Sequence, residues 1–138
     1  MALSQSLRNR AVVIEKYITI PVASATVVGP AVPAGTLVLA AGVEVLAAVS
    51  ADPTTYTVAA SDGTTTFMAA TSIKSLAAGA IKAGTTAGLV SAADTVDAVV
   101  VVSGTAPSTT TAARLWAVII DVNDCVLPAA EVDRDTLA

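Results

Sequence analysis

Few residues in this chain are of types that do chemistry, and their spacing builds no familiar catalytic site. The sequence has no histidine and a single cysteine, Cys125. A Ser-His-Asp or Cys-His arrangement needs an imidazole as its general base, so both are excluded. One thiolate cannot build a zinc site, and no Gly-x-x-x-x-Gly-Lys-Ser/Thr motif is present to hold a phosphate. The sequence therefore predicts no metal site and no cofactor.

The remaining catalytic option is a pair of carboxylates, as in glycoside hydrolysis. Asp94 and Asp97 are close in sequence, but Asp94 precedes a predicted strand and Asp97 lies within it. We interpret Asp94 as a turn residue bonding its own backbone, and Asp97 as a solvent-facing strand position. Sugar sites also need aromatic platforms, and the aromatic residues are four: Tyr17, Tyr56, Phe67 and Trp116. The prediction is a protein that is not an enzyme.

The composition indicates a chain whose folded state is stabilised further by contacts with other subunits. Apolar residues make up 54% of the sequence but aromatic residues only 3%, because alanine (30) and valine (21) dominate. Charged residues reach 13%, about half the usual share. Small side chains bury little area each, and burial stabilises by roughly 25 cal/mol per Å². A core of alanine and valine therefore has a thin margin over chain entropy, which burial between subunits would supplement.

Charge and hydropathy patterning exclude two classes of partner. The net charge is −4, and the basic residues are scattered along the chain rather than clustered. This distribution argues against direct nucleic-acid binding. Residues 17–43 carry no charge, but Pro21, Gly29, Pro30, Pro33 and Gly35 interrupt them. A spanning helix needs about 20 continuous apolar residues, so we expect no membrane span, and we find no signal peptide.

Short β-prone segments separated by turn residues predict an all-β chain. The predicted strands are residues 12–19, 22–28, 36–49, 54–60, 64–70, 96–102 and 114–122. Asp62-Gly63 marks a hairpin, and Gly42 is the expected bulge or bend. Residues 72–88 are expected to form a loop with an embedded turn, and residues 73–78 could form a helical turn. About seven or eight strands in one domain are typical of an antiparallel β-sandwich or a small barrel.

The last predicted strand, residues 114–122, is apolar on both faces. Such a strand is central in a sandwich or covered by a neighbour. Trp116 lies within it, and we interpret this residue as a core anchor in preference to an interface hot spot. Cys125 is interpreted as a small buried hydrophobe.

The two ends of the chain carry opposite charge. Residues 1–16 hold Arg8, Arg10 and Lys16 against one acid, while residues 121–138 hold five acids against Arg134. These ends could pair between neighbouring subunits, or they could be ordinary solvated tails. The candidate interface residues are Arg8, Arg10, Val12, Ile14, Lys16, Glu131, Asp133 and Asp135.

Several segments together resemble the small β-sandwich structural proteins of tailed bacteriophages, especially capsid decoration (cement) proteins. They are the turn VPAG at residues 32–35, the hairpin TYTVAASDGTTTF at 55–67, the block ADTVDAVVVVSGTAP at 93–107 and the closing strand RLWAVIIDV. The resemblance covers roughly residues 20–122. It implies a sandwich over that range, an N-terminal arm at residues 1–19 with a possible strand, and an acidic C-terminal arm at 123–138.

The role implied by the resemblance is that of a molecular clamp. Such a protein sits as a homotrimer on the outer surface of the capsid, binds the major capsid protein and bridges its neighbouring copies. On this hypothesis residues 12–19 add as a strand to an exposed sheet edge of a partner. Three alternatives stay open: a tail, neck or fibre component of the particle, a carbohydrate-binding module, and a small hydrolase.

Overall fold

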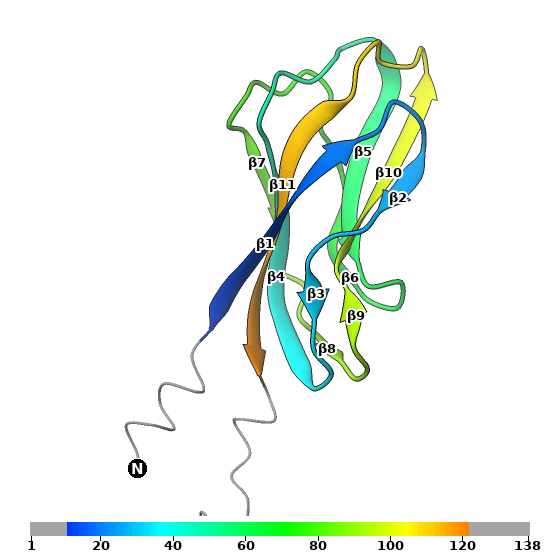
Figure 1. Cartoon of the computed structure of the whole chain (residues 1–138). Helices are drawn as coiled ribbons and strands as arrows, with labels where there is room; N and C mark the ends of the chain where they lie inside the picture. Colours follow the sequence, from blue (N-terminus) through cyan, green and yellow to red (C-terminus); the bar gives the residue numbers. More distant parts are fainter. Residues whose placement is uncertain (1–10, 122–138) are drawn as a thin grey trace, which may run out of the picture.

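The computed structural model describes residues 11–121, and this part of the chain contains eleven strands and no helix (Figure 1). The strands are β1 (Val12–Ile20), β2 (Ala25–Val27), β3 (Ala31–Val32), β4 (Thr36–Val45), β5 (Pro53–Ser61), β6 (Thr66–Ser72), β7 (Ile81–Gly84), β8 (Gly88–Val90), β9 (Asp94–Thr95), β10 (Asp97–Gly104) and β11 (Thr111–Asp121). Over the same residues, no helix is long and apolar enough to cross a membrane.

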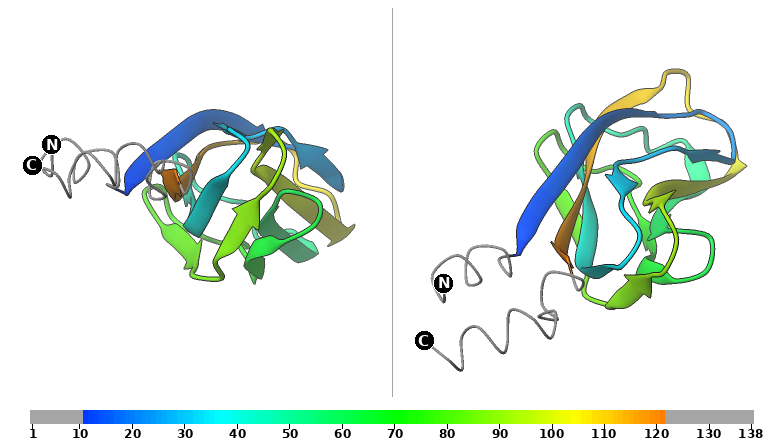
Figure 2. Two further views of the ribbon diagram at one scale, coloured as in Figure 1. Left: turned by 90° about the horizontal axis from the view of Figure 1, so that it is seen from below. Right: turned by 60° about the horizontal axis from the view of Figure 1, so that its bottom comes forward.

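The strands form two packed layers, as the end-on and tilted views also show (Figures 1 and 2). Sheet A has the order β1-β11-β4-β7, with β8 also paired to β4, and sheet B has the order β2-β10-β5-β6. A short ladder of β3 and β9 forms a third, two-stranded sheet. All of these pairings are antiparallel. The prediction of an all-β sandwich is confirmed, and the sheets do not close into a barrel.

The core lies between the sheets and follows the two-residue period of the strands. On β11, Ala113, Leu115 and Ala117 are fully buried, and on β5 so are Val58 and Ala60. The largest fully buried side chains are Tyr56, Phe67, Ile20, Met68 and Ile73. The rest of the core is chiefly valine and alanine, as the composition predicted.

Trp116 is not the core anchor that we predicted. It lies on β11 between Leu115 and Ala117, and the pleat of the strand turns these neighbours inward and Trp116 outward. Its indole is half-buried against Gly42 of the adjacent strand β4, where an added Cβ would lie 2.4 Å from the ring. The core-filling aromatic residues are instead Tyr56 and Phe67.

The strand predicted at residues 12–19 is present as β1, and it pairs with β11 of its own chain along its whole length. Ile18 and Ile20 of β1 belong to the buried core. The boundary expected at residue 19, between an N-terminal arm and the sandwich, therefore falls within a strand of sheet A. Residues 1–10 and 123–138 of the two predicted arms lie outside the described residues.

Two local predictions are wrong. The irregularity in β4 is at Leu39, because Val118 pairs with Ala40 and Ile119 with Val38, whereas Gly42 is in regular register. The expected loop at residues 72–88 contains strand β7, which pairs with β4. The embedded turn expected in this loop is present, without a helix. Strand β7 has the sequence Ile-Lys-Ala-Gly. Its apolar and polar residues alternate over too few positions for a strand to be predicted from the sequence.

The Asp62-Gly63 hairpin between β5 and β6 is confirmed. Gly63 adopts a φ of 88°, which glycine reaches without a steric penalty. The Asp62 carboxylate oxygen Oδ1 accepts hydrogen bonds from the backbone N–H groups of Thr64 and Thr65, at 2.9 and 2.6 Å. The turn therefore has its own polar partners, and the hairpin register is fixed locally.

One buried hydroxyl ties the two sheets together. The Tyr56 side chain on β5 of sheet B is 1% exposed, and its O–H donates to the carbonyl oxygen of Pro21 at 2.9 Å. Pro21 directly follows β1 of sheet A. Burial raises the pKa of Tyr56 above its ordinary value of 10.0, although a hydrogen bond with Thr111 acts in the opposite direction.

We predict that Tyr56→Phe lowers the free energy of unfolding by about 1 kcal/mol, because the Pro21 carbonyl loses its donor. Chemical denaturation measures this difference. Tyr17→Phe is the matched control, because Tyr17 is 67% exposed, and it should leave stability unchanged. Equal effects of the two substitutions would contradict the role assigned to the Tyr56 hydroxyl.

The same residue predicts an alkaline pH dependence. Because the pKa of Tyr56 is higher in the folded than in the unfolded chain, its contribution is complete below pH 10.0. It is lost as the pH rises above that value, since the unfolded chain then binds fewer protons. Denaturation at increasing pH should show stability falling more steeply for the unsubstituted protein than for Tyr56→Phe.

Candidate protein-binding face

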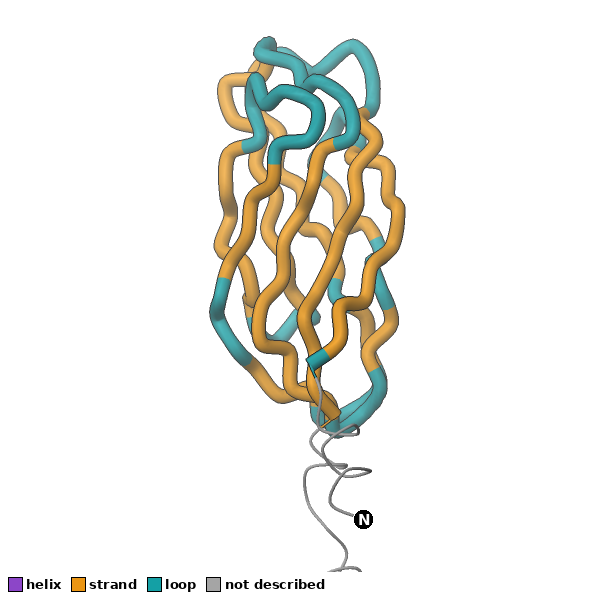
Figure 3. The backbone as a smooth tube through the Cα atoms, turned by 90° about the vertical axis from the view of Figure 1, so that its left-hand side faces the viewer, coloured by secondary structure: helices purple, strands orange, loops and turns teal. Residues whose placement is uncertain are grey.

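The outer surface of sheet A carries large apolar side chains that nothing in the described part of the chain covers. Directly paired residues of an antiparallel sheet lie on the same face, so the register defines the set. The sheet A outer face consists of Val13, Glu15 and Tyr17 on β1, Arg114, Trp116, Val118 and Ile120 on β11, Leu37, Ala40, Gly42 and Glu44 on β4, Ile81 and Ala83 on β7, and Leu89 on β8. Figure 3 views the molecule from the side on which β1, β7 and β11 are drawn in Figure 1.

Four side chains of this face are more than half exposed. The exposed fractions are 59% for Val13, 67% for Tyr17, 57% for Ile81 and 55% for Leu89. Half of the large exposed apolar residues of the described chain are therefore gathered on one face of one sheet. Scattered exposed apolar residues are ordinary, but a contiguous set is typical of an interaction surface.

The outer face of sheet B is of a different kind. Its paired residues are Thr26 on β2, Thr55, Thr57, Ala59 and Ser61 on β5, Ser72 on β6, and Asp97, Val99, Val101 and Ser103 on β10. Hydroxyl groups dominate this set, and Val101 is its one strongly exposed large apolar side chain, at 44%. Threonine and serine suit a β surface that stays in water. The contrast indicates that the outer face of sheet A, rather than that of sheet B, is the one that binds another protein.

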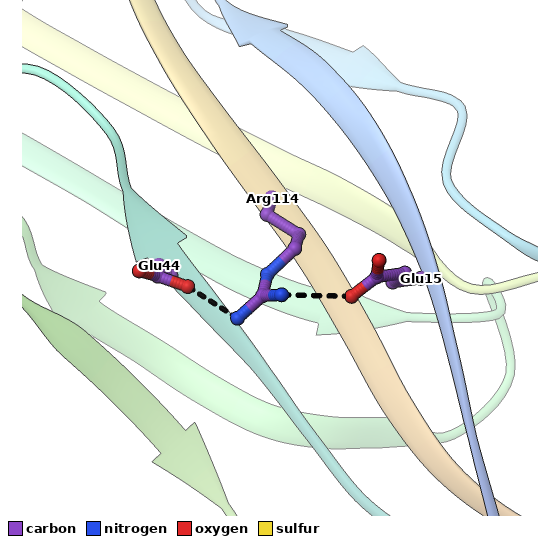
Figure 4. Close-up of polar contacts among 3 residues, drawn as sticks. All are labelled: Glu15, Glu44 and Arg114. Carbon is purple, nitrogen blue, oxygen red and sulfur yellow. Dashed lines mark hydrogen bonds and ion pairs between the residues drawn. The ribbon is translucent and has the colours of Figure 1, made fainter. Parts of the chain in front are cut away.

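A short charged strip crosses the upper part of the sheet A outer face (Figure 4). The Arg114 guanidinium on β11 lies between two carboxylates, those of Glu15 on β1 and Glu44 on β4. Arg114 Nη1 donates to Glu15 Oε2 at 2.9 Å, and Nη2 donates to Glu44. Desolvation opposes the charged form of Arg114, but the two carboxylates outweigh it and raise its pKa above the ordinary value.

The lower part of the same face has no charge. Val13, Val118 and Ala40 form one row across β1, β11 and β4, and Ile120, Leu37 and Leu89 form a second across β11, β4 and β8. On β11, Trp116 lies between Val118 of the first apolar row and Arg114 of the charged strip, and it pairs with Glu15. The chain enters β1 and leaves β11 at this end of the molecule (Figure 1), so the apolar part of the face adjoins both described ends.

The predicted interface residues are divided by the fold. Val12, Ile14 and Lys16 lie on β1 but on the side facing sheet B, because Lys16 pairs with the buried Leu115. Ile14 packs against the core, whereas Val12 is 54% exposed. Arg8, Arg10, Glu131, Asp133 and Asp135 lie outside the described residues. Val13 and Tyr17, which lie on the outer face of β1, were not among the predicted interface residues. Their alternation with Ile14 and Lys16 along the strand was visible in the sequence.

The candidate carboxylate pair serves the backbone. Asp94 Oδ1 accepts from the N–H of Thr95 at 2.8 Å, which fits the turn role predicted for it. Asp97 Oδ1 accepts from the N–H of Gly29 at 3.2 Å and from Thr95 Oγ1 at 2.6 Å, so it fixes a loop instead of only facing solvent. Residues 11–121 contain no group of three or more acidic or cysteine side chains placed to hold a metal ion.

Comparison with known proteins gives a fold likeness. No protein-family model matches the chain, and no curated protein matches its sequence. A chain of the structure titled "Cyanophage Pam1 capsid asymmetric unit" is similar with a TM-score of 0.60 and 17% identity, over 80% of this chain and 84% of that one. A chain of the acidic stable capsid structure of Helicobacter pylori bacteriophage KHP30 is similar with a TM-score of 0.53 and 16% identity, over 80% and 95%. At these identities the likeness establishes a shared fold.

We predict that Gly42→Ala displaces Trp116 from β4, because the added Cβ would lie 2.4 Å from Cζ2 of the ring and 2.6 Å from the Lys82 carbonyl oxygen. Overpacking of this kind costs about 1–3 kcal/mol. Trp116 is the sole tryptophan, so its fluorescence reports the change directly, and the emission should shift to longer wavelength with stronger quenching by acrylamide.

Ala83→Ser is the control for this experiment, because Ala83 pairs with Gly42 and is exposed. It should leave the emission unchanged. An unaltered spectrum in Gly42→Ala would show that the indole does not rest on Gly42.

Proposed function

We propose that this chain is a structural subunit of a bacteriophage virion, and specifically a capsid decoration protein. On this proposal it sits on the outer surface of the shell as a homotrimer, binds the major capsid protein and bridges its neighbouring copies. The observation that carries the proposal is the fold shared with chains of two phage capsid structures. The matches span 80% of this chain and 84% and 95% of the two phage chains, so they concern most of each subunit.

The chemistry of the chain supports a binding role over catalysis. The full sequence has no histidine, and the candidate carboxylate pair, Asp94 and Asp97, is engaged by backbone and hydroxyl groups. We therefore propose that the protein is not an enzyme. What the described surface offers is a sheet face with exposed Val13, Tyr17, Ile81 and Leu89, which is suited to packing against another protein.

The size of the core also supports an assembled state. Apart from Tyr56 and Phe67, the buried hydrophobic side chains are aliphatic, mostly valine and alanine, with one methionine. Such residues contribute less burial per residue than large aliphatic and aromatic ones. A decoration protein must withstand the internal pressure of packaged DNA. Burial of the sheet A outer face between subunits would add to the stability that its small core side chains supply. A decoration protein works in that assembled state.

The test is imaging of particles made by the phage that carries the gene. We expect mass spectrometry to find the chain in purified particles, and cryo-electron microscopy to show a two-layer β-sandwich on the outer surface, around three-fold positions. Particles from a gene deletion should release their DNA at a lower temperature, and adding the purified protein back should restore the higher one.

Two results would overturn the proposal. Absence of the chain from purified particles would remove the virion role altogether. Density for the chain in the tail, neck or fibres, with a bare shell, would replace the decoration role by that of another virion component.

A further inference from the structure

The charged strip of the sheet A outer face lacks one cation. Glu15 and Glu44 share the single guanidinium of Arg114, so the three side chains together carry a net charge of −1. The Glu15 side chain is 42% exposed, which leaves its carboxylate accessible to a further donor. The strip would therefore be complemented by a basic group from outside the sheet.

The described part of the chain does not provide that group. The three lysines within residues 11–121 lie elsewhere. Lys16 and Lys82 are on core-facing rows, paired with Leu115 and Val43, and Lys74 lies in the exposed segment after β6. Below the strip the face is apolar, so its complement is a segment that combines apolar side chains with arginine or lysine.

One segment of this protein has that chemistry. Residues 1–10 read MALSQSLRNR, with Arg8 and Arg10, the apolar residues Met1, Leu3 and Leu7, and no acid. In the sequence the segment directly precedes β1, and β1 begins at the end of the molecule where the apolar part of the face lies (Figure 1). Ten extended residues span at most about 35 Å, and β1 itself spans about 30 Å. The segment is long enough to run along a whole sheet.

We propose that residues 1–10 of one copy bind across the sheet A outer face of a second copy, with Arg8 and Arg10 facing its Glu15 and Glu44. Pairing within one copy is disfavoured by geometry. Arg10 precedes Glu15 by five positions, about 17 Å along an extended strand. A continued strand would also turn both arginines to the face opposite Glu15. The exchange joins neighbouring copies of the chain.

This inference deepens the proposed function and rests on it in one respect, namely that copies of the chain adjoin one another. The test therefore uses purified full-length protein without capsids, so that each proposal can fail alone. Particle imaging can find the subunit on a shell while cross-linking shows no exchange of the segment. Cross-linking can equally succeed for a protein that is absent from particles.

The experiment cross-links two different chains. Both chains carry Cys125→Ser, so that no native thiol reacts. The first chain carries Asn9→Cys, which keeps both arginines. The second chain has a tag and carries Val13→Cys, on the outer face beside Glu15. After mixing, a short bis-maleimide should join the two chains, and the tag resolves the mixed product by mass. Replacing Val13→Cys by Val101→Cys, on the outer face of sheet B, should give no product.

Charge supplies the second readout. Adding Arg8→Glu and Arg10→Glu to the Asn9→Cys chain should lower the mixed product about tenfold, because two surface ion pairs become repulsive contacts. High salt should act in the same direction on the unreversed chain.

Each other outcome overturns the proposal. No mixed product, or equal product with Val101→Cys, means that the segment does not bind this face. A product that is lost on neutralising Glu131, Asp133 and Asp135 but unchanged by Glu15→Gln and Glu44→Gln means that the two terminal segments bind each other.

Discussion

The structure depends on strand β11, which is paired along its length on both edges. It lies between β1 and β4, and its side chains alternate between a buried row and an outward row. Ala113, Leu115 and Ala117 contact the core, while Arg114 and Trp116 support the surface of sheet A. A one-residue slip of β11 would exchange these rows, placing a guanidinium in the core and leucine in water. The central strand therefore fixes both the core and the candidate binding face.

The core is built mostly from small side chains, whereas one of the two outer faces carries large apolar ones. Sheet B meets water with threonine and serine, whereas sheet A presents tyrosine, tryptophan, valine, isoleucine and leucine. A chain with few large apolar side chains has placed several of them outside its core. This distribution is costly for an isolated domain, and it is expected of a subunit whose sheet is buried in an assembly.

The polar groups of the described chain are used mainly to fix local geometry. Asp62 closes a hairpin, Asp94 and Asp97 hold the loops around β9, and Tyr56 links the sheets through the Pro21 carbonyl. The strip of Glu15, Arg114 and Glu44 differs from these because it holds three adjacent strands together while keeping one carboxylate accessible. It serves the sheet and offers a contact to a neighbour at the same time.

The sequence by itself determined the fold class, the hairpin at Asp62-Gly63 and the absence of histidine chemistry. These follow from local properties: strand alternation, turn residues and residue types. It also showed that residues 114–122 are apolar on both faces. Only the tertiary structure decided which of those faces is the core, that Trp116 rests on Gly42, and that β7 completes sheet A. Each of these depends on pairing between segments far apart in the chain, and with both rows of β11 apolar, no local pattern tells inside from outside.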